Sequence, residues 1–156
     1  MRLLTLVFVT LPVVIADQVS KAWIARAISP FDPLEIIPDF FHITFIRNRG
    51  GAFGFLSGID HSFFQAGFII ATVAAIGFIA VLYAKLHDRQ RWPATGMALI
   101  IGGAIGNLID RVRWGSVVDF IDLHIYSHHW PAFNVADSAI TVGSVVLGIC
   151  IVFKKW

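Results

Sequence analysis

The sequence contains a single cysteine, Cys150, and few charged residues. One cysteine excludes an intramolecular disulfide and a metal cluster built from thiolates. It also excludes a four-helix thiol oxidase, because thiol–disulfide exchange in such an enzyme needs several cysteines. Charged residues make up only 14% of the chain, and a net charge of +2 is too small and too scattered for a nucleic-acid-binding surface.

Apolar residues are correspondingly abundant. They account for 57% of the chain, and the mean hydropathy is +0.77. Soluble proteins have about 45–50% apolar and about 25% charged residues. A chain of 156 residues cannot hide this much apolar surface in a water-soluble core. The composition therefore predicts a membrane protein.

Four segments are long and apolar enough to span a bilayer, which needs roughly 20 residues. They are predicted at about 3–22, 63–84, 93–109 and 135–153. Four spans place both termini on one side and the loops at about 23–62 and 110–134 on the other. We therefore expect an all-α membrane protein that forms one integral membrane domain over residues 1–156.

The basic residues give only limited information on orientation. Six lysines and arginines flank the spans on each side, but those on the terminal side are concentrated in short segments. This concentration favours cytoplasmic termini and extracytoplasmic long loops. Residues 1–16 also imitate a cleavable secretory signal. Because the polar cluster from Asp17 to Lys21 follows directly, we expect this segment to be retained as the first span.

The two long loops differ in composition. Residues 39–48 form an aromatic and β-branched run that is followed by several glycines between 50 and 54. This pattern predicts two short strands around a glycine turn, and hence a small sheet resting on the bilayer surface. The second loop contains Trp114, Tyr126 and Trp130, which suit a membrane interface.

Two aspartates lie where the last two spans meet the same membrane face. Asp119 follows the third span and Asp137 begins the fourth. If a hairpin brings their carboxyls together, they share a proton, so that one acts as base toward water and the other as acid toward a carbonyl oxygen. Peptide hydrolysis needs this division of labour. Alternatively, Asp137 is stabilised by the helix dipole and Asp119 is a solvated loop residue.

The third span combines small and polar residues. Glycines spaced four apart within 102–106 allow close approach of a neighbouring helix. Asn107 and Asp110 share one helical face, and Arg111 is expected to pair with Asp110 or with another carboxylate. Such an ion pair is compatible with a structural role at the helix end and with a direct role in catalysis.

Two further clusters are weaker candidates. The i, i+4 spacing of Asp17 and Lys21 permits a salt bridge, whereas Ser20 and Lys21 are adjacent on the helix and do not face each other as in a serine/lysine hydrolase. Histidines at 124, 128 and 129 have a metal-compatible spacing, but no carboxylate base accompanies them in a His-Glu-x-x-His arrangement. We expect these histidines to be exposed at the membrane interface.

These motifs together resemble the bacterial lipoprotein signal peptidases, also called signal peptidase II. The resemblance extends over essentially the whole chain. Its motifs are Asp17 with Lys21, the run Asn48-Arg49-Gly50-Gly51-Ala52-Phe53-Gly54, the block from Gly103 to Arg111, Val117-Val118-Asp119-Phe120, and Phe133-Asn134-Val135-Ala136-Asp137-Ser138.

The resemblance implies an aspartic endopeptidase of the bacterial inner membrane, with four transmembrane helices and a small extracytoplasmic β-cradle. It would remove the signal peptide from diacylglyceryl-modified prolipoproteins before the lipidated cysteine, with Asp119 and Asp137 as the catalytic pair. It implies membrane lipids as surroundings, globomycin-type inhibitors, and no metal or organic cofactor. The residues implied to bind substrate or support the pair are Asp17, Lys21, Asn48, Gly50, Gly103, Asn107, Asp110, Arg111, Asn134 and Ala136.

Two other classes of function remain open from the residues themselves. A small proton- or ion-coupled carrier also uses membrane carboxylates, but it predicts acidic groups at mid-membrane depth and an internal repeat. Most aspartates here lie near one face, and the sequence has no evident repeat. A lipid-binding scaffold without enzymatic activity would explain the aromatic residues and glycines, but it would leave the aspartates without a role.

Overall fold

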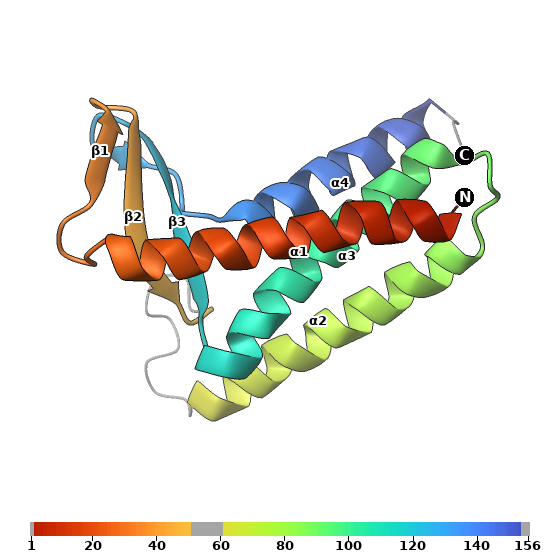
Figure 1. Cartoon of the computed structure of the whole chain (residues 1–156), viewed down its shortest axis with the longest axis horizontal. Helices are drawn as coiled ribbons and strands as arrows, with labels where there is room; N and C mark the ends of the chain where they lie inside the picture. Colours follow the sequence, from red (N-terminus) through yellow and green to blue (C-terminus); the bar gives the residue numbers. More distant parts are fainter. Residues whose placement is uncertain (1, 51–60, 154–156) are drawn as a thin grey trace.

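The computed structural model describes residues 2–50 and 61–153. Within these residues, four helices are long and apolar enough to cross a membrane, which confirms the predicted number of spans. Their bounds are α1 Arg2–Ala27, α2 His61–Ala84, α3 Arg91–Trp114 and α4 Val135–Val152. The start of α1 and the end of α4 lie at one end of the bundle, opposite the β-sheet (Figure 1).

Two helices extend further than the hydropathy predicted. The first ends at Ala27 and the third at Trp114, each about one turn beyond the apolar segment. Consequently Asp110 and Arg111 lie inside α3 instead of in the loop expected at 110–134. Hydropathy marks where a helix meets polar surroundings, whereas backbone hydrogen bonding continues until Gly115, whose φ of 63° ends the helix in a left-handed conformation.

The described residues also form the small sheet that the sequence predicted. Its strands are β1 Leu34–Ile37, β2 Phe41–Asn48, β3 Val117–Ile125 and β4 His128–His129, paired antiparallel in that order. The tight turn between β1 and β2 contains Asp39 at a φ of 58°. The predicted glycine turn falls mainly on Gly51, Ala52, Phe53 and Gly54, which lie outside the described residues, as do Lys154 and Lys155.

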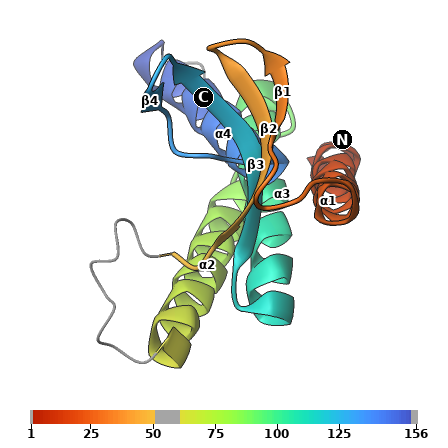
Figure 2. The ribbon, with the colours of Figure 1, turned by 90° about the vertical axis from the view of Figure 1, so that its left-hand side faces the viewer.

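One of the two strands that pair with β2 was not expected. It is β3, which comes from the second long loop, so residues about 70 positions apart lie side by side, such as Ile46 and Asp119. A short apolar cluster of Ile24, Val118 and Phe120 packs the end of α1 against this sheet. Figure 2 shows β2 and β3 crossing the end of the bundle beside α1 and α3. The sheet is thereby held at one end of the bundle.

Helix α3 is the most buried of the four spans and packs against the other three. The prediction that small residues let helices approach closely is confirmed. A Cβ atom at Gly102 would lie 3.0 Å from Cβ of Val13 in α1, and one at Gly143 would lie 2.5 Å from the carbonyl oxygen of Gly96. These close approaches bring the polar residues of α1, α3 and α4 within hydrogen-bonding distance of one another.

Candidate active site

Asp119 lies on β3 with only 2% of its surface exposed. Its two carboxyl oxygens accept hydrogen bonds from side-chain amides: Oδ1 from Nδ2 of Asn134 at 2.7 Å and Oδ2 from Nδ2 of Asn48 at 2.9 Å. Burial raises the pKa of Asp119 from 3.8 to about 6; the Asn48 hydrogen bond opposes this rise, and the negative charge of Asp137 adds to it. The alternative that Asp119 is a solvated loop residue is therefore wrong.

Asp137 lies in the first turn of α4 and is partly buried. It forms a capping box with Asn134: its backbone N–H donates to Oδ1 of Asn134 at 2.9 Å, and its Oδ2 accepts from the backbone N–H of Asn134 at 3.3 Å. Its other oxygen, Oδ1, accepts from Nδ2 of Asn107 at 2.8 Å. The helix-terminal role considered for Asp137 is thus present, together with a contact to α3 that capping does not require.

Asn134 connects the two aspartates. It is fully buried. Its amide nitrogen donates to the carboxyl of Asp119 and its amide oxygen accepts from the backbone N–H of Asp137, while its own backbone N–H donates to the Asp137 carboxyl. The side-chain nitrogen also lies 3.2 Å from the carbonyl oxygen of Val118 and 3.3 Å from Oδ1 of Asn107. Because these contacts come from β3, α3 and α4, Asn134 sets the relative positions of the two carboxyls.

A buried ionic cluster lies behind this pair. Nζ of Lys21 is 2.9 Å from Oδ2 of Asp17 and 3.1 Å from Oδ2 of Asp110, which confirms the predicted Asp17–Lys21 salt bridge. All three side chains are at least 95% buried. Lys21 also donates to Oδ1 of Asn107 at 2.9 Å. Asn107 therefore joins the ionic cluster to Asp137.

The cluster also holds the backbone around the two aspartates. Asp110 accepts from the backbone N–H of Val118 at 3.1 Å, and Asp17 accepts from the backbone N–H of Ala136 at 3.0 Å. Val118 precedes Asp119, and Ala136 precedes Asp137. Each buried carboxylate thus fixes the peptide next to one member of the pair.

Gln18 was not predicted as a site residue, although its polarity inside an apolar span was a usable signal. Its Nε2 donates to Asp110 at 3.0 Å and lies 3.2 Å from both Oδ2 of Asp17 and the carbonyl oxygen of Gly106. Gln18 therefore satisfies lone pairs of both acids that Lys21 leaves open.

Arg111 was expected to pair with Asp110 or with another carboxylate. Lys21 pairs with Asp110 instead, and no ion pair of Arg111 is present among the described residues. The Arg111 guanidinium instead lies over the Phe68 ring, 4.4 Å from its centroid, and Nη1 is buried without a hydrogen-bond partner among the described residues. Phe68 also lies against Gly50, where an added Cβ would collide with the ring. Gly50 has a φ of 85°, and its N–H donates to Oδ1 of Asn48 at 2.8 Å. Nothing in the sequence pointed to Phe68.

Gly103 lies at a close approach between α3 and α4. A Cβ atom there would collide with the carbonyl oxygen of Ala136 and lie 2.8 Å from Cγ1 of Ile140. Ala136 is itself fully buried. The absence of a side chain at Gly103 thus lets the first turn of α4 reach the polar residues of α3.

Two grooves adjoin the aspartates. One has a volume of about 850 Å³ and is lined by residues of β2 and β3, including Asp119, together with Phe68. The other, of about 500 Å³, is lined by the start of α4, including Asp137. Both grooves include Trp130, Pro131 and Ala132 in their lining, so this segment borders the groove of Asp119 and the groove of Asp137.

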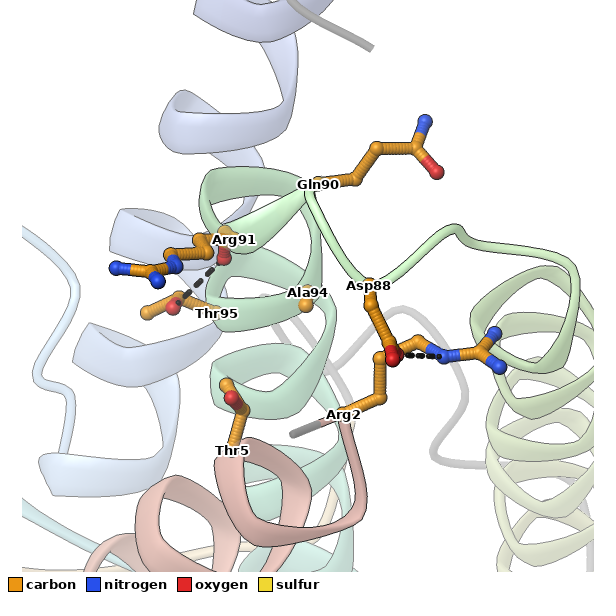
Figure 3. Close-up of a pocket in the computed structure, with 7 residues that line it drawn as sticks. All are labelled: Arg2, Thr5, Asp88, Gln90, Arg91, Ala94 and Thr95. Atoms are coloured by element: carbon orange, nitrogen blue, oxygen red, sulfur yellow. Dashed lines mark hydrogen bonds and ion pairs between the residues drawn. The ribbon is translucent and has the colours of Figure 1, made fainter.

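A third pocket lies at the opposite end of the bundle and has a different character (Figure 3). There Arg2 pairs with Asp88 at 2.9 Å, and the hydroxyl of Thr95 donates to the carbonyl oxygen of Arg91 at 3.0 Å. This pocket contains neither Asp119 nor Asp137, nor any residue of the ionic cluster.

Not all of the three histidines predicted to be exposed are exposed. His128 and His129 are exposed, but His124 is 94% buried, because its side chain packs between the rings of His42 and His129. The expectation of an exposed His124 is therefore wrong.

The fold and this polar centre define a multi-pass membrane protein with buried carboxyl groups at one end of a helical bundle. The family model for Signal peptidase (SPase) II matches residues 9–153, and the chain belongs to this family. The family removes signal peptides from prolipoproteins, so the protein is a membrane protease and not an ion carrier.

Curated relatives agree along most of the chain. It is 48% identical to the lipoprotein signal peptidase of Geobacter sulfurreducens over 90% of this chain and 87% of the relative. It is 40% identical to that of Staphylococcus carnosus over 95% of this chain and 90% of the relative. A solved bacterial membrane enzyme structure, obtained by the in meso method, has a TM-score of 0.82 at 38% identity, covering 94% of this chain and 92% of that one.

Proposed function

We propose that the protein is an aspartic endopeptidase in which Asp119 and Asp137 activate a water molecule together. It cleaves diacylglyceryl-modified prolipoproteins immediately before the lipidated cysteine, and residues 1–156 act as one protease domain. The observation that carries this proposal is that Asn134 donates to both carboxyls, from its buried side-chain amide to Asp119 and from its backbone N–H to Asp137.

Proton sharing supports the choice of these two acids. The pKa of Asp119 is raised to about 6, and the charge of Asp137 contributes to the rise. A pair in which one ionised acid disfavours ionisation of the other keeps one proton to a higher pH than a lone carboxyl does. The ionised member then removes a proton from water, while the protonated member donates one to the scissile carbonyl oxygen. The proton belongs to the pair as a coupled system.

The surrounding residues have supporting roles in this proposal. Asn134 orients both carboxyls, because its side-chain nitrogen donates to Asp119 and its backbone N–H donates to the carboxyl of Asp137. Lys21, Asp17 and Asp110 hold the backbone next to the pair. Arg111 is a candidate substrate contact, since its buried Nη1 has no hydrogen-bond partner among the described residues.

The two grooves fit an extended peptide whose lipid anchor stays in the bilayer. A peptide lying along the segment Trp130–Ala132 would contact both grooves, the one lined by Asp119 and the one lined by Asp137. A diacylglyceryl group would hold the cysteine at headgroup depth. Fixing the scissile bond at that depth reduces the reaction to orientation of one peptide bond and one water. In this proposal the sheet end faces the extracytoplasmic side of the bacterial inner membrane.

The proposal is tested by reconstituting the protein with a diacylglyceryl-modified prolipoprotein and identifying both products by mass spectrometry. Asp119→Asn and Asp137→Asn are expected to abolish cleavage while leaving folded protein. A matched control is Asp39→Asn, because Asp39 is exposed and asparagine tolerates its positive φ. An unmodified precursor is the substrate control. Near-normal turnover by either active-site variant, or a product cut elsewhere than before the cysteine, would contradict the proposal.

A further inference from the structure

Three histidines and an aspartate gather on the sheet. None of them has a role in the proposed catalysis, although Asp122 and His129 line the same groove as Asp119. His42 lies directly opposite Asp122 in the pairing of β2 with β3, and His124 lies opposite His129 in the pairing of β3 with β4. Asp122 and His124 are two positions apart, so they point to the same side of β3. The sheet register therefore gathers four side chains that bind metals well.

Three of these side chains are close enough to share one ion. His42, Asp122 and His124 each offer one ligand atom, and these atoms all lie within 4.8 Å of one another. The rings of His42 and His124 are 4.3 Å apart at their centroids and inclined at 51°. Nitrogen and oxygen ligands about 2.0–2.1 Å from a tetrahedral zinc ion are roughly 3.3 Å apart, so small side-chain rotations would complete the set.

A second observation points independently to a ligand. His124 is 94% buried, and its Nδ1 has no hydrogen-bond partner among the described residues. An unpaired polar atom at such a depth is costly, and most are satisfied by a protein group, water or an ion. The backbone N–H of His124 is held by the carbonyl oxygen of Phe40 at 2.9 Å, so the residue is anchored in the sheet.

The residues around the three ligands also suit a metal site. Nδ1 of His129 lies 2.9 Å from Oδ1 of Asp122, and Nε2 of His42 lies 3.6 Å from Oε1 of Glu35. Histidines and carboxylates that bind metals commonly have such outer partners, which orient them. His129 stacks against His124 with an interplanar angle of 16°, an arrangement that suits a supporting residue better than a further ligand to the same ion.

We infer that His42, Asp122 and His124 form a binding site for a divalent transition-metal ion, of which Zn²⁺ best matches two imidazoles and one carboxylate. A solvent molecule would complete the tetrahedron. The ion would join β2 to β3 and so stabilise the strand that carries Asp119. This inference departs from the expectation that no metal is bound, and it is independent of the proposed catalytic mechanism.

The test uses full-length, tag-free protein in detergent micelles. The protein is stripped with a chelator, incubated with Zn²⁺, dialysed, and analysed for bound zinc by mass spectrometry. We expect about one zinc per chain in the wild type. His42→Gln and His124→Gln should each lose most of it, whereas the exposed neighbour His128 is a matched control, and His128→Gln should retain it.

A second measurement keeps the test decisive if His124→Gln folds poorly. Zinc should raise the melting temperature of the wild type and of His128→Gln, but not that of His42→Gln, whose side chain is less buried than that of His124. Zinc retention by a folded His42→Gln variant equal to that of the wild type would overturn the inference. So would a wild type that retains no zinc, or an equal loss in His128→Gln.

Discussion

Replacing Asp119 with asparagine should change stability in a pH-dependent manner. Burial raises the pKa of Asp119 from 3.8 to about 6, so the folded protein favours the neutral acid. When a carboxyl has a higher pKa in the folded state than in the unfolded state, its ionisation lowers the free energy of unfolding. The penalty is complete above about pH 6 and is relieved as the pH falls toward 3.8. Its full size is about 3 kcal/mol.

Asparagine removes this penalty but also loses a hydrogen bond. Asp119 accepts from Asn48 with one oxygen and from Asn134 with the other, whereas an asparagine side chain has a single acceptor oxygen. Leaving one buried donor unpaired costs about 1–3 kcal/mol at every pH. The Asp119→Asn variant should therefore be equal to or up to about 2 kcal/mol more stable than the wild type near pH 8, and less stable near pH 4.

The assay is equilibrium unfolding of both proteins in mixed detergent micelles at several pH values. The difference in free energy of unfolding between variant and wild type should change by about 2 kcal/mol between roughly pH 4 and pH 8. The lost hydrogen bond costs the same at both pH values, so it does not contribute to this change. The exposed control Asp39→Asn should show little change over the same range. A difference for Asp119→Asn that does not vary with pH would refute the argument that burial disfavours its charge.

Three further results are expected. Lys21→Met should destabilise the protein by about 3–5 kcal/mol because it leaves two buried carboxylates without a cation, whereas the exposed Lys85→Met should change stability by less than about 0.5 kcal/mol in the same unfolding assay. Gly103→Ala should lower the free energy of unfolding by about 1–3 kcal/mol and reduce cleavage, because the added methyl group displaces α4. Gly77 has open space around it, so Gly77→Ala should be neutral or slightly stabilising. Equal effects of the two substitutions would contradict the close-packing argument. The rate of prolipoprotein cleavage should show an inflection near pH 6, the pKa of Asp119, and a flat profile between about pH 5 and 7 would argue against the aspartic mechanism.

The number and approximate positions of the spans follow from hydropathy, because a bilayer imposes a length on each apolar segment. The Asp17–Lys21 salt bridge follows from helical spacing alone, since residues four apart share a face. The presence of a face of small residues on α3 follows in the same way from the spacing of its glycines, although the helices that these glycines contact do not. In each case the physical cause acts within one helix or over a few residues.

The tertiary structure alone decided the other features. The sequence left open whether Arg111 pairs with Asp110 or with another carboxylate, whereas in the structure Lys21 reaches Asp110 from a different helix. The strand β3 forms in the second long loop because it pairs with β2, which lies about 70 residues earlier in the chain. The contact of one buried asparagine, Asn134, with both aspartates depends on how β3, α3 and α4 meet. Such contacts join segments that are distant in the chain, and the periodicity of the sequence does not predict which of these segments pack together.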